Sequence, residues 1–150
     1  MELKNYQNIY KMLKTHLYNL IMLNGNKQTS EKVFLKSLKK IQKHHNKKKI
    51  EDIIKFGLIN SSPIVYLKSI KRKRKQTIEF PFLLKHRSRL SYGIKSILKF
   101  CKSKKSISFF DQLNLELINS SKKSSISVEN KKKLHQQAFL KKKFANYRWF

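Results

Sequence analysis

The sequence predicts a mainly α-helical fold, a six-helix bundle-like domain with one β-hairpin inserted between the third and fourth helices. Apolar residues recur at helical spacing in six separate segments. Between the third and fourth of these, two arms rich in β-branched and aromatic residues flank a polar run. The length of 150 residues suits one domain with one core, so we expect residues 1–150 to form a single unit.

The first two helices are expected on either side of a glycine turn. Residues 5–23 carry the first apolar stripe, and Asn-Gly-Asn at 24–26 ends it, because Gly and Asn tolerate a left-handed backbone. Thr29 or Ser30 is expected to cap a second helix that runs to about residue 43, with Glu31 near the positive end of its dipole. The apolar positions of the two helices are Tyr6, Ile9, Tyr10, Leu13, Leu17, Leu20, Ile21, Val33, Phe34, Leu38 and Ile41.

A change of pattern follows the short third helix, which is expected over 50–59 with Gly57 near its end. After Pro63, two β-prone arms predict a hairpin over about 64–83. Its tip, 71–75, holds five successive cations and neither Gly nor Asn, so no favoured tight turn can be assigned. Five adjacent cations repel each other, so this tip is not expected to stabilise the fold. A projecting hairpin with such a tip is instead suited to contact with phosphates.

Three further helices are expected over 87–101, 107–119 and 128–146. Ser127 is expected to cap the last, with Glu129 in its first turn. The helix over 107–119 contains Asp111 and Glu116, so it is expected to face nucleic acid least. The apolar positions of the first two of these helices are Leu90, Ile94, Ile97, Leu98, Cys101, Ile107, Phe110, Leu113, Leu117 and Ile118.

The charge of the chain indicates its partner. Lys and Arg number 36 against eight Asp and Glu, which gives a formal charge of +28. A compact chain with this charge repels itself, and a polyanion relieves the repulsion. Nucleic acid fits best, because each neutralised phosphate also releases a condensed counterion. Ten Phe, six Tyr and one Trp argue against a disordered basic tail.

The same composition disfavours an enzyme, a metal site and a cofactor. Acidic residues are scarce, and none are paired for acid–base work. Cys101 is the single cysteine, and His44-His45 has no acidic neighbour, so a solvated loop is favoured there over a metal site. Three glycines could hardly form a phosphate-binding loop for a small-molecule substrate. No apolar run is long enough to cross a bilayer, and the N-terminus has no secretory pattern, so no membrane partner is expected.

The closing residues carry the most specific motif. Phe-Ala-Asn-Tyr-Arg-Trp at 144–149 resembles the Phe-Ala-His-Tyr-Arg-Trp that typically ends the last helix in the family of the seventh small-subunit ribosomal protein. His135 and Ala138 fall at the family's matching histidine and alanine. Residues 23–32 resemble its first turn and the start of its second helix, and Pro63 and Pro81 resemble the two prolines that bracket its hairpin. The resemblance covers the chain from about residue 17.

The chain departs from the family pattern in three places. Lys73 and Arg74 stand where the family's hairpin tip usually has a paired glycine, Phe139 replaces an acidic residue, and the basic arm before the first helix is largely absent. Contacts made by that arm are therefore not expected here. A short, lysine-rich, glycine-poor version resembles organellar copies, especially mitochondrially encoded ones. The expected location is thus the mitochondrial ribosome, in preference to a plastid.

The resemblance implies a structural constituent of the small ribosomal subunit. Such a protein binds the 3′ major domain of small-subunit ribosomal RNA and helps to assemble the head. Its hairpin lies near exit-site tRNA and the messenger path, and it adjoins other small-subunit proteins. The expected RNA-binding residues are Lys27, Lys32, Lys68, Lys71, Arg72, Lys73, Arg74, Lys75, Arg87, Arg89, Lys95, Lys141, Lys142, Lys143, Tyr147, Arg148 and Trp149.

Several alternatives stay open at the level of the sequence. The runs at 47–49 and 131–133 could each be ordinary solvated surface, and Trp149 could pack against the first helix instead of RNA. His135 is expected to be packed or to contact RNA. The chain could also be a general nucleic-acid chaperone or DNA-compacting protein, which would bind duplex DNA as tightly as an RNA junction. A membrane-active amphipathic protein is a more remote reading.

Overall fold

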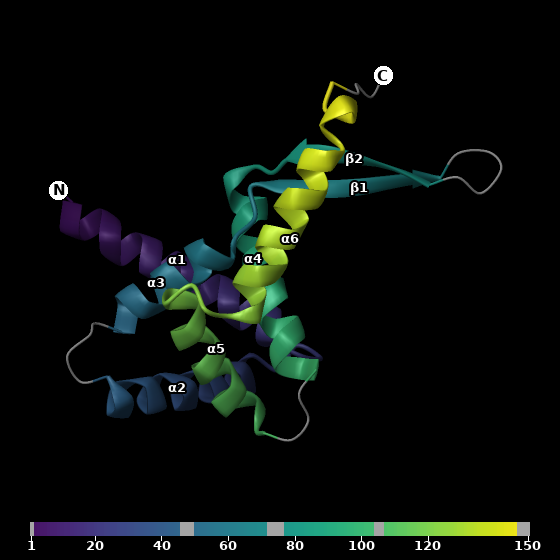
Figure 1. Ribbon diagram of the computed structural model, residues 1–150. Helices are drawn as coiled ribbons and strands as arrows, with labels where there is room; N and C mark the ends of the chain where they lie inside the picture. The colour runs from purple at the N-terminus through teal and green to yellow at the C-terminus, as the bar shows by residue number, and fades with distance from the viewer. Residues whose placement is uncertain (1, 46–49, 72–76, 104–106, 147–150) are drawn as a thin grey trace.

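The computed structural model describes residues 2–45, 50–71, 77–103 and 107–146. Within these residues, six α-helices and one two-stranded antiparallel sheet follow each other in the predicted order, which confirms the fold class (Figure 1). The elements are α1 (Glu2–Ile21), α2 (Lys27–His44), α3 (Ile50–Ser61), β1 (Val65–Lys71), β2 (Thr77–Leu83), α4 (His86–Ser103), α5 (Phe109–Ser121) and α6 (Ile126–Leu140). A 3₁₀ turn, η1 (Lys142–Phe144), follows α6.

Some of the predicted positions lie outside the described residues. These are the connector lysines at 47–49, the tip residues Arg72, Lys73, Arg74 and Lys75, and the closing residues Tyr147, Arg148 and Trp149. The side chains of residues 2–10 and of His44 also lie outside, so the apolar stripe of α1 is described only from residue 11 onward.

The core lies between the first five helices. Leu17, Phe34, Ile54, Ile94 and Leu117, one from each of α1 to α5, are completely buried. Burying one such side chain contributes about 1.5–3 kcal/mol, so these apolar stripes decide how the helices pack. In contrast, α6 adds no residue to this cluster and packs on its outside, against β1 and the helices α3, α4 and α5.

Two mid-helix glycines let neighbouring elements approach closely. A Cβ atom on Gly57 of α3 would lie 2.7 Å from Ser120 Oγ and 3.1 Å from the Leu117 carbonyl oxygen of α5. A Cβ atom on Gly93 of α4 would lie 3.0 Å from the Cα atom of Ser62. At both glycines the nearest atom is a serine Oγ, which for Gly93 is that of Ser62 at 2.6 Å, and the next is a backbone atom, which cannot turn aside as a side chain can.

The single cysteine lies in this core. Cys101 of α4 is 1% exposed, and burial, together with the nearby charge of Glu116, raises the pKa of its thiol to about 12. Glu116 of α5 is itself buried, and it accepts hydrogen bonds from the hydroxyl and the backbone N–H of Ser127 at the start of α6. A carboxylate at a helix N-terminus is favourably placed with respect to the helix dipole.

Two helix caps differ from the sequence prediction. The left-handed turn is confirmed, with φ of 50° at Asn24 and 75° at Gly25. However, Asn26 rather than Thr29 or Ser30 caps α2, because its side chain accepts the Thr29 N–H while the hydroxyls of Thr29 and Ser30 bond back within the first turn.

The cap of α6 is also displaced by two residues. Ser125 accepts the Val128 N–H at 3.3 Å and begins the helix, so the prediction of Ser127 as the cap was wrong. The competing partner is Glu116, which takes the Ser127 hydroxyl as a hydrogen-bond donor. The hydrogen bond to the buried carboxylate of Glu116 decides the role of Ser127, and the sequence near Ser127 gives no sign of that bond.

The ends of α5 and α6 differ from the prediction as well. Ile107 lies before α5 and is exposed, so it does not belong to the apolar stripe of that helix. The last helix ends at Leu140 and not near 146. Beyond it, Lys141 pairs with Glu79 of β2 and Phe144 packs against β2, and these tertiary contacts accompany the change to a 3₁₀ turn.

Candidate nucleic-acid interface

The hairpin is fixed to the helices by aromatic contacts. β1 and β2 project beyond the helices in Figure 1, with Val65 opposite Leu83 at the base. Tyr66 of β1 lies against Tyr92 of α4 with ring centroids 4.7 Å apart, and Phe80 of β2 meets the edge of Phe144 in η1 at 5.5 Å. Such ring pairs contribute about 0.5–1.5 kcal/mol beyond the area that they bury. The base of the hairpin is therefore held firmly against α4 and η1.

Side chains of α6 form hydrogen bonds to the end of α3 and to the residue just before β1. The ammonium group of Lys131 donates to the Asn60 carbonyl at 2.9 Å, close to the C-terminus of α3. One turn later, His135 Nε2 accepts the backbone N–H of Ile64 at 3.1 Å. Because Nε2 is the acceptor, the neutral ring carries its proton on Nδ1. His135 is thus a packed histidine, one of the two roles that the sequence left open.

Cations are crowded where α4 and α6 meet. Burial lowers the pKa of Lys131, and the charges of Arg89 and Lys123 lower it further. Burial, Lys131 and Arg89 together also lower the pKa of His135. Among the described residues, the buried Nε of Arg89 has no hydrogen-bond partner. A bound anion would relieve this crowding, because it favours the charged form of each group.

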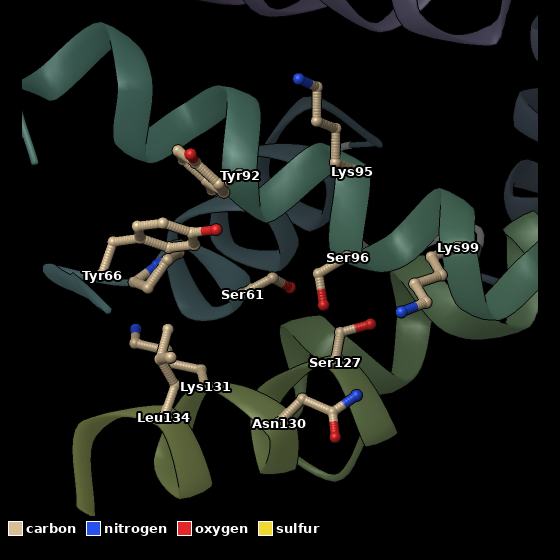
Figure 2. Close-up of a pocket in the computed structure, with 11 residues that line it drawn as sticks. Ser61, Tyr66, Tyr92, Lys95, Ser96, Lys99, Ser127, Asn130, Lys131 and Leu134 are labelled. Carbon is tan, nitrogen blue, oxygen red and sulfur yellow. The ribbon is translucent and has the colours of Figure 1, made fainter. Parts of the chain in front are cut away.

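A groove of about 550 Å³ separates α4 from α6 (Figure 2). Its lining residues are Ser61, Pro63, Tyr66, Tyr92, Lys95, Ser96, Lys99, Ser127, Asn130, Lys131 and Leu134. Figure 2 shows Tyr66 and Tyr92 at one end, and Ser96, Lys99 and Ser127 gathered at the other. The groove therefore offers an aromatic end, where Lys131 and Leu134 also lie, and a hydroxyl-bearing end with Lys99.

The α4 wall of the groove is a single helical stripe. Tyr92, Lys95, Ser96 and Lys99 follow the spacing i, i+3, i+4, i+7, which places them on one face of the helix. The opposite face of α4 bears the core residues, so the helix presents apolar side chains to the bundle and a polar, aromatic stripe to α6. Lys99 is exposed and forms no ion pair with any described carboxylate.

Most of the predicted cations that the structure describes lie near this groove and hairpin. Lys68 and Lys71 are exposed on β1, and Arg87 and Lys95 are exposed on α4. Lys142 and Lys143 are exposed in η1, which contacts β2 and α6. Segments that are far apart in the sequence thus place their lysines on adjoining elements.

Two predicted residues are only partly accessible. Arg89 is half-buried, and its Nε lies below the surface beside α6. Lys141 is half-buried and pairs with Glu79 of β2, so part of its charge is already neutralised within the protein.

The structure separates Lys27 and Lys32 from the other predicted residues. Both are exposed on α2, and Lys27 lies 4.0 Å from Glu31 one turn along. Figure 1 shows α2 at the opposite end of the molecule from β1 and β2. A surface that contains the hairpin does not extend to these two lysines, and any RNA contact that they make is a separate one.

The prediction missed Lys99, Lys131 and the Tyr66–Tyr92 pair as site residues. The stripe on α4 is visible in the sequence and could have singled out Lys99. The pairing of Tyr66 with Tyr92, and the position of Lys131 beneath them, depend on how β1 and α6 pack on α4. Local spacing carries no signal for that packing.

Two other classes of site were searched for in the described part of the chain. No group of three or more His, Cys, Asp or Glu residues there could hold a metal ion. None of its helices combines the length and apolar character that a membrane span needs.

The family model described as ribosomal protein S7p/S5e matches residues 2–142. The chain belongs to this family. The match covers the hairpin, the α4–α6 groove and the helices that support them, and it confirms the resemblance seen in the closing motif, although that motif itself extends beyond the matched residues.

Individual relatives agree with this assignment. The chain is 29% identical over 137 residues to small ribosomal subunit protein uS7 of Phytoplasma australiense, with 91% of this chain and 86% of the relative covered. It is 35% identical over 125 residues to protein uS7m of Schizosaccharomyces pombe, with 83% of this chain but only 48% of the relative covered. The uS7 protein of Symbiobacterium thermophilum is 27% identical, with 91% and 86% covered.

Members of the S7 family are structural, non-enzymatic constituents of the small ribosomal subunit, and this chain is one of its members. The charge of the chain fits that role, because ribosomal RNA supplies the closely spaced phosphates that +28 requires.

Proposed function

We propose that this S7-family chain binds the 3′ major domain of small-subunit ribosomal RNA through one continuous face and thereby helps to assemble the head. The face consists of the hairpin, the polar stripe of α4 and the adjoining side of α6. The observation that carries the proposal is that Lys95, Lys99 and the half-buried Lys131 line one groove at the Tyr66–Tyr92 base of the hairpin, from which β1 carries the exposed Lys68 and Lys71 outward.

The composition of this face suits folded RNA. Folded RNA is recognised through phosphates, 2′-hydroxyls and shape more than through paired bases. Lysines act as point charges toward phosphates, while the tip arginines Arg72 and Arg74 offer planar forks for bidentate contacts. Arg87, which lines a groove with residues of α1, would make a separate contact. The closing residues Tyr147, Arg148 and Trp149 would add a mixed basic and aromatic contact with RNA.

The hairpin is proposed to lie near exit-site tRNA and the messenger path. It is the element that projects farthest from the helices in Figure 1, and its predicted tip holds five successive cations. A rigid base with a cationic end can reach a nucleic acid that the helical body does not touch.

Neighbouring small-subunit proteins are proposed to contact the base of the hairpin. The side chains of Leu83, Phe139 and Leu140 are 81%, 73% and 79% exposed. Exposure of such large apolar side chains to water is unfavourable, and they cannot bind phosphates. An adjoining apolar groove of about 670 Å³ lies between β2 and the C-terminal end of α6. A protein surface would bury these side chains.

The compartment is proposed to be the mitochondrion. The abundance of Lys, Asn, Ile and Phe and the scarcity of Gly are typical of AT-rich organellar genes. A mitochondrial protein of fission yeast is among the relatives, beside several bacterial ones. Sedimentation of a tagged chain tests this, since we expect it to travel with mitochondrial small subunits.

Competition binding tests the RNA assignment directly. The purified chain is incubated with a transcript of the 3′ major domain at fixed salt, and unlabelled duplex DNA of equal length is added. We expect the DNA to compete poorly, because a face shaped for an RNA junction does not match a regular duplex. Equal affinity for the two would overturn the proposed RNA-selective face and favour general nucleic-acid binding by the isolated chain.

A further inference from the structure

We propose that the groove between α4 and α6 holds one unstacked nucleotide of the bound RNA. This inference rests on the proposed RNA-binding function and identifies what the groove itself receives. The base would lie at the end formed by Tyr66 and Leu134, and its phosphate would lie at the end formed by Ser96 and Lys99 (Figure 2).

The size and shape of the groove favour a single nucleotide over a helix. A volume of about 550 Å³ lies within the range of about 300–1,000 Å³ typical of small-ligand sites. A double helix cannot enter such a space, but a splayed base can. Sequence-specific proteins usually recognise RNA through unstacked bases of loops and bulges, placed against aromatic side chains.

The aromatic end has unused hydrogen-bonding capacity. Tyr66 and Tyr92 are half-buried, and neither phenolic hydroxyl has a partner among the described residues. Figure 2 shows the Tyr66 hydroxyl directed toward the gap that separates it from Ser96. A base edge that entered the gap would supply a hydrogen-bond partner, and Leu134 of α6 would cover part of the ring with an apolar surface.

The cationic end is equally unoccupied by protein groups. Lys99 has no acidic partner, and the Ser96 hydroxyl makes no hydrogen bond, within the part of the chain that the structure describes. Asn130 is exposed on the α6 wall, where its amide can both donate and accept. Ribose and phosphate need this combination of a cation, a hydroxyl and an amide.

The test uses the full chain with a transcript of the 3′ major domain, probed by acylation of RNA 2′-hydroxyls. Ser96→Trp fills the groove, and Ser103→Trp places the same ring at an exposed position near the end of α4 as its control. We expect the Ser96 variant to bind about tenfold more weakly and to change the reactivity of one or two nucleotides only. The Ser103 variant should match the wild type in both measurements.

A second pair of variants covers the case in which Ser96→Trp fails to fold, which circular dichroism would reveal. Tyr66→Leu and Lys99→Gln should change the reactivity of the same nucleotides, whereas Lys102→Gln, on the same helix but outside the groove, should not. Unchanged reactivity in both groove variants would overturn the nucleotide site while leaving RNA binding intact. Failure of the wild type to bind the transcript would instead overturn the proposed function.

Free adenosine monophosphate provides the remaining arm of the experiment. At millimolar concentration it should not displace the transcript from the wild-type chain, because one nucleotide lacks the phosphate contacts made by the rest of the face. Efficient displacement would assign the groove to a free nucleotide and contradict the proposal.

Discussion

At the scale of single residues, Gly93 shows how close packing can outweigh helix propensity. Alanine is intrinsically better than glycine inside a helix by about 1 kcal/mol. At this position, however, an added methyl group would press on the backbone of Ser62, and overpacking typically costs about 1–3 kcal/mol.

Gly93→Ala is therefore expected to lower the free energy of unfolding by about 1–2 kcal/mol. Urea denaturation measures this as a lower midpoint with an unchanged slope. Gly57→Ala is a second test of the same kind, because a Cβ atom there would lie 2.7 Å from Ser120 Oγ and 3.1 Å from the Leu117 carbonyl oxygen, and we expect a similar cost. A Gly93→Ala protein more stable than the wild type would contradict the close contact.

His135 makes the junction of α6 and β1 sensitive to acid. Its Nε2 accepts the Ile64 N–H, and burial beside Lys131 and Arg89 lowers the pKa of the ring below its ordinary 6.5. As the pH falls, His135 therefore binds a proton at a higher pH in the unfolded chain than in the folded one. The contribution of the neutral ring is complete above about pH 6.5 and is lost as the pH falls through the lower pKa of the folded state.

His135→Gln keeps a hydrogen-bond acceptor but removes the titration. Between pH 7.5 and 5.5, the wild type should lose more stability than this variant, as measured by thermal unfolding in buffers of equal ionic strength. His86→Gln, at an exposed position of α4, should behave like the wild type. Identical pH profiles for the wild type and the His135 variant would show that the ring does not titrate differently on folding.

At the scale of elements, the hairpin separates RNA affinity from protein stability. Aromatic pairs hold the base of the hairpin in place, and the predicted tip cations follow β1 in the sequence. Replacing both Arg72 and Arg74 by Ala should weaken binding to the 3′ major domain transcript and reduce the salt slope of log K by about one for each lost phosphate contact.

Filter binding between 50 and 300 mM KCl measures that slope. Replacement of Lys36 and Lys39, exposed on α2 at the other end of the molecule, removes the same charge and is expected to change the slope less. If the two double variants lose equal slope, the hairpin has no special share in the contact.

Elements with strong local patterns were predictable, and most of their boundaries agree with the structure to within about three residues, but the caps of α2 and α6 and the end of α6 were not predictable. The stripes of α1 to α5 carry the core, so periodicity alone located these helices. The capping of α2 by Asn26 and of α6 by Ser125 depends on which of several nearby hydroxyls and amides wins a hydrogen bond. The early end of α6 coincides with contacts to β2 from Lys141 and Phe144, more than sixty residues away from their partners.

The candidate site divides in the same way. Lys68, Lys71 and Lys95 were chosen from charge alone and are exposed in the structure, while their contact with RNA stays a prediction. Prediction of the groove would have required knowing that α6 packs across α4. The sequence of α6 gives little sign of this packing, because few of its apolar residues are buried. Long-range hydrogen bonds by Lys131 and His135 help to hold it there, and a single sequence does not encode these visibly.

At the scale of the whole molecule, the charge of +28 sets the response to salt. Repulsion between cations opposes the compact state, and salt screens it over a Debye length of about 10 Å at 0.1 M. The melting temperature of the isolated chain should therefore rise between 20 and 300 mM KCl, whereas its affinity for RNA should fall over the same range.

Differential scanning calorimetry and filter binding on one preparation measure both trends. The RNA complex should also melt at a higher temperature than the free chain, since a ligand that binds only the folded state stabilises it. Sodium sulfate at matched ionic strength distinguishes screening from specific anion binding. A melting temperature independent of salt would mean that the charges are too far apart to matter.

The burial of the Cys101 side chain provides a way to follow the folding of this protein during ribosome assembly. With a pKa of about 12, the sulfhydryl is ionised at pH 8 to roughly one part in ten thousand, and no reagent can reach it in the closed bundle. Alkylation of this one sulfur would therefore occur only while the bundle is open. A brief pulse of a maleimide probe during ribosome biogenesis would thus mark chains that have not yet closed, without any engineered label.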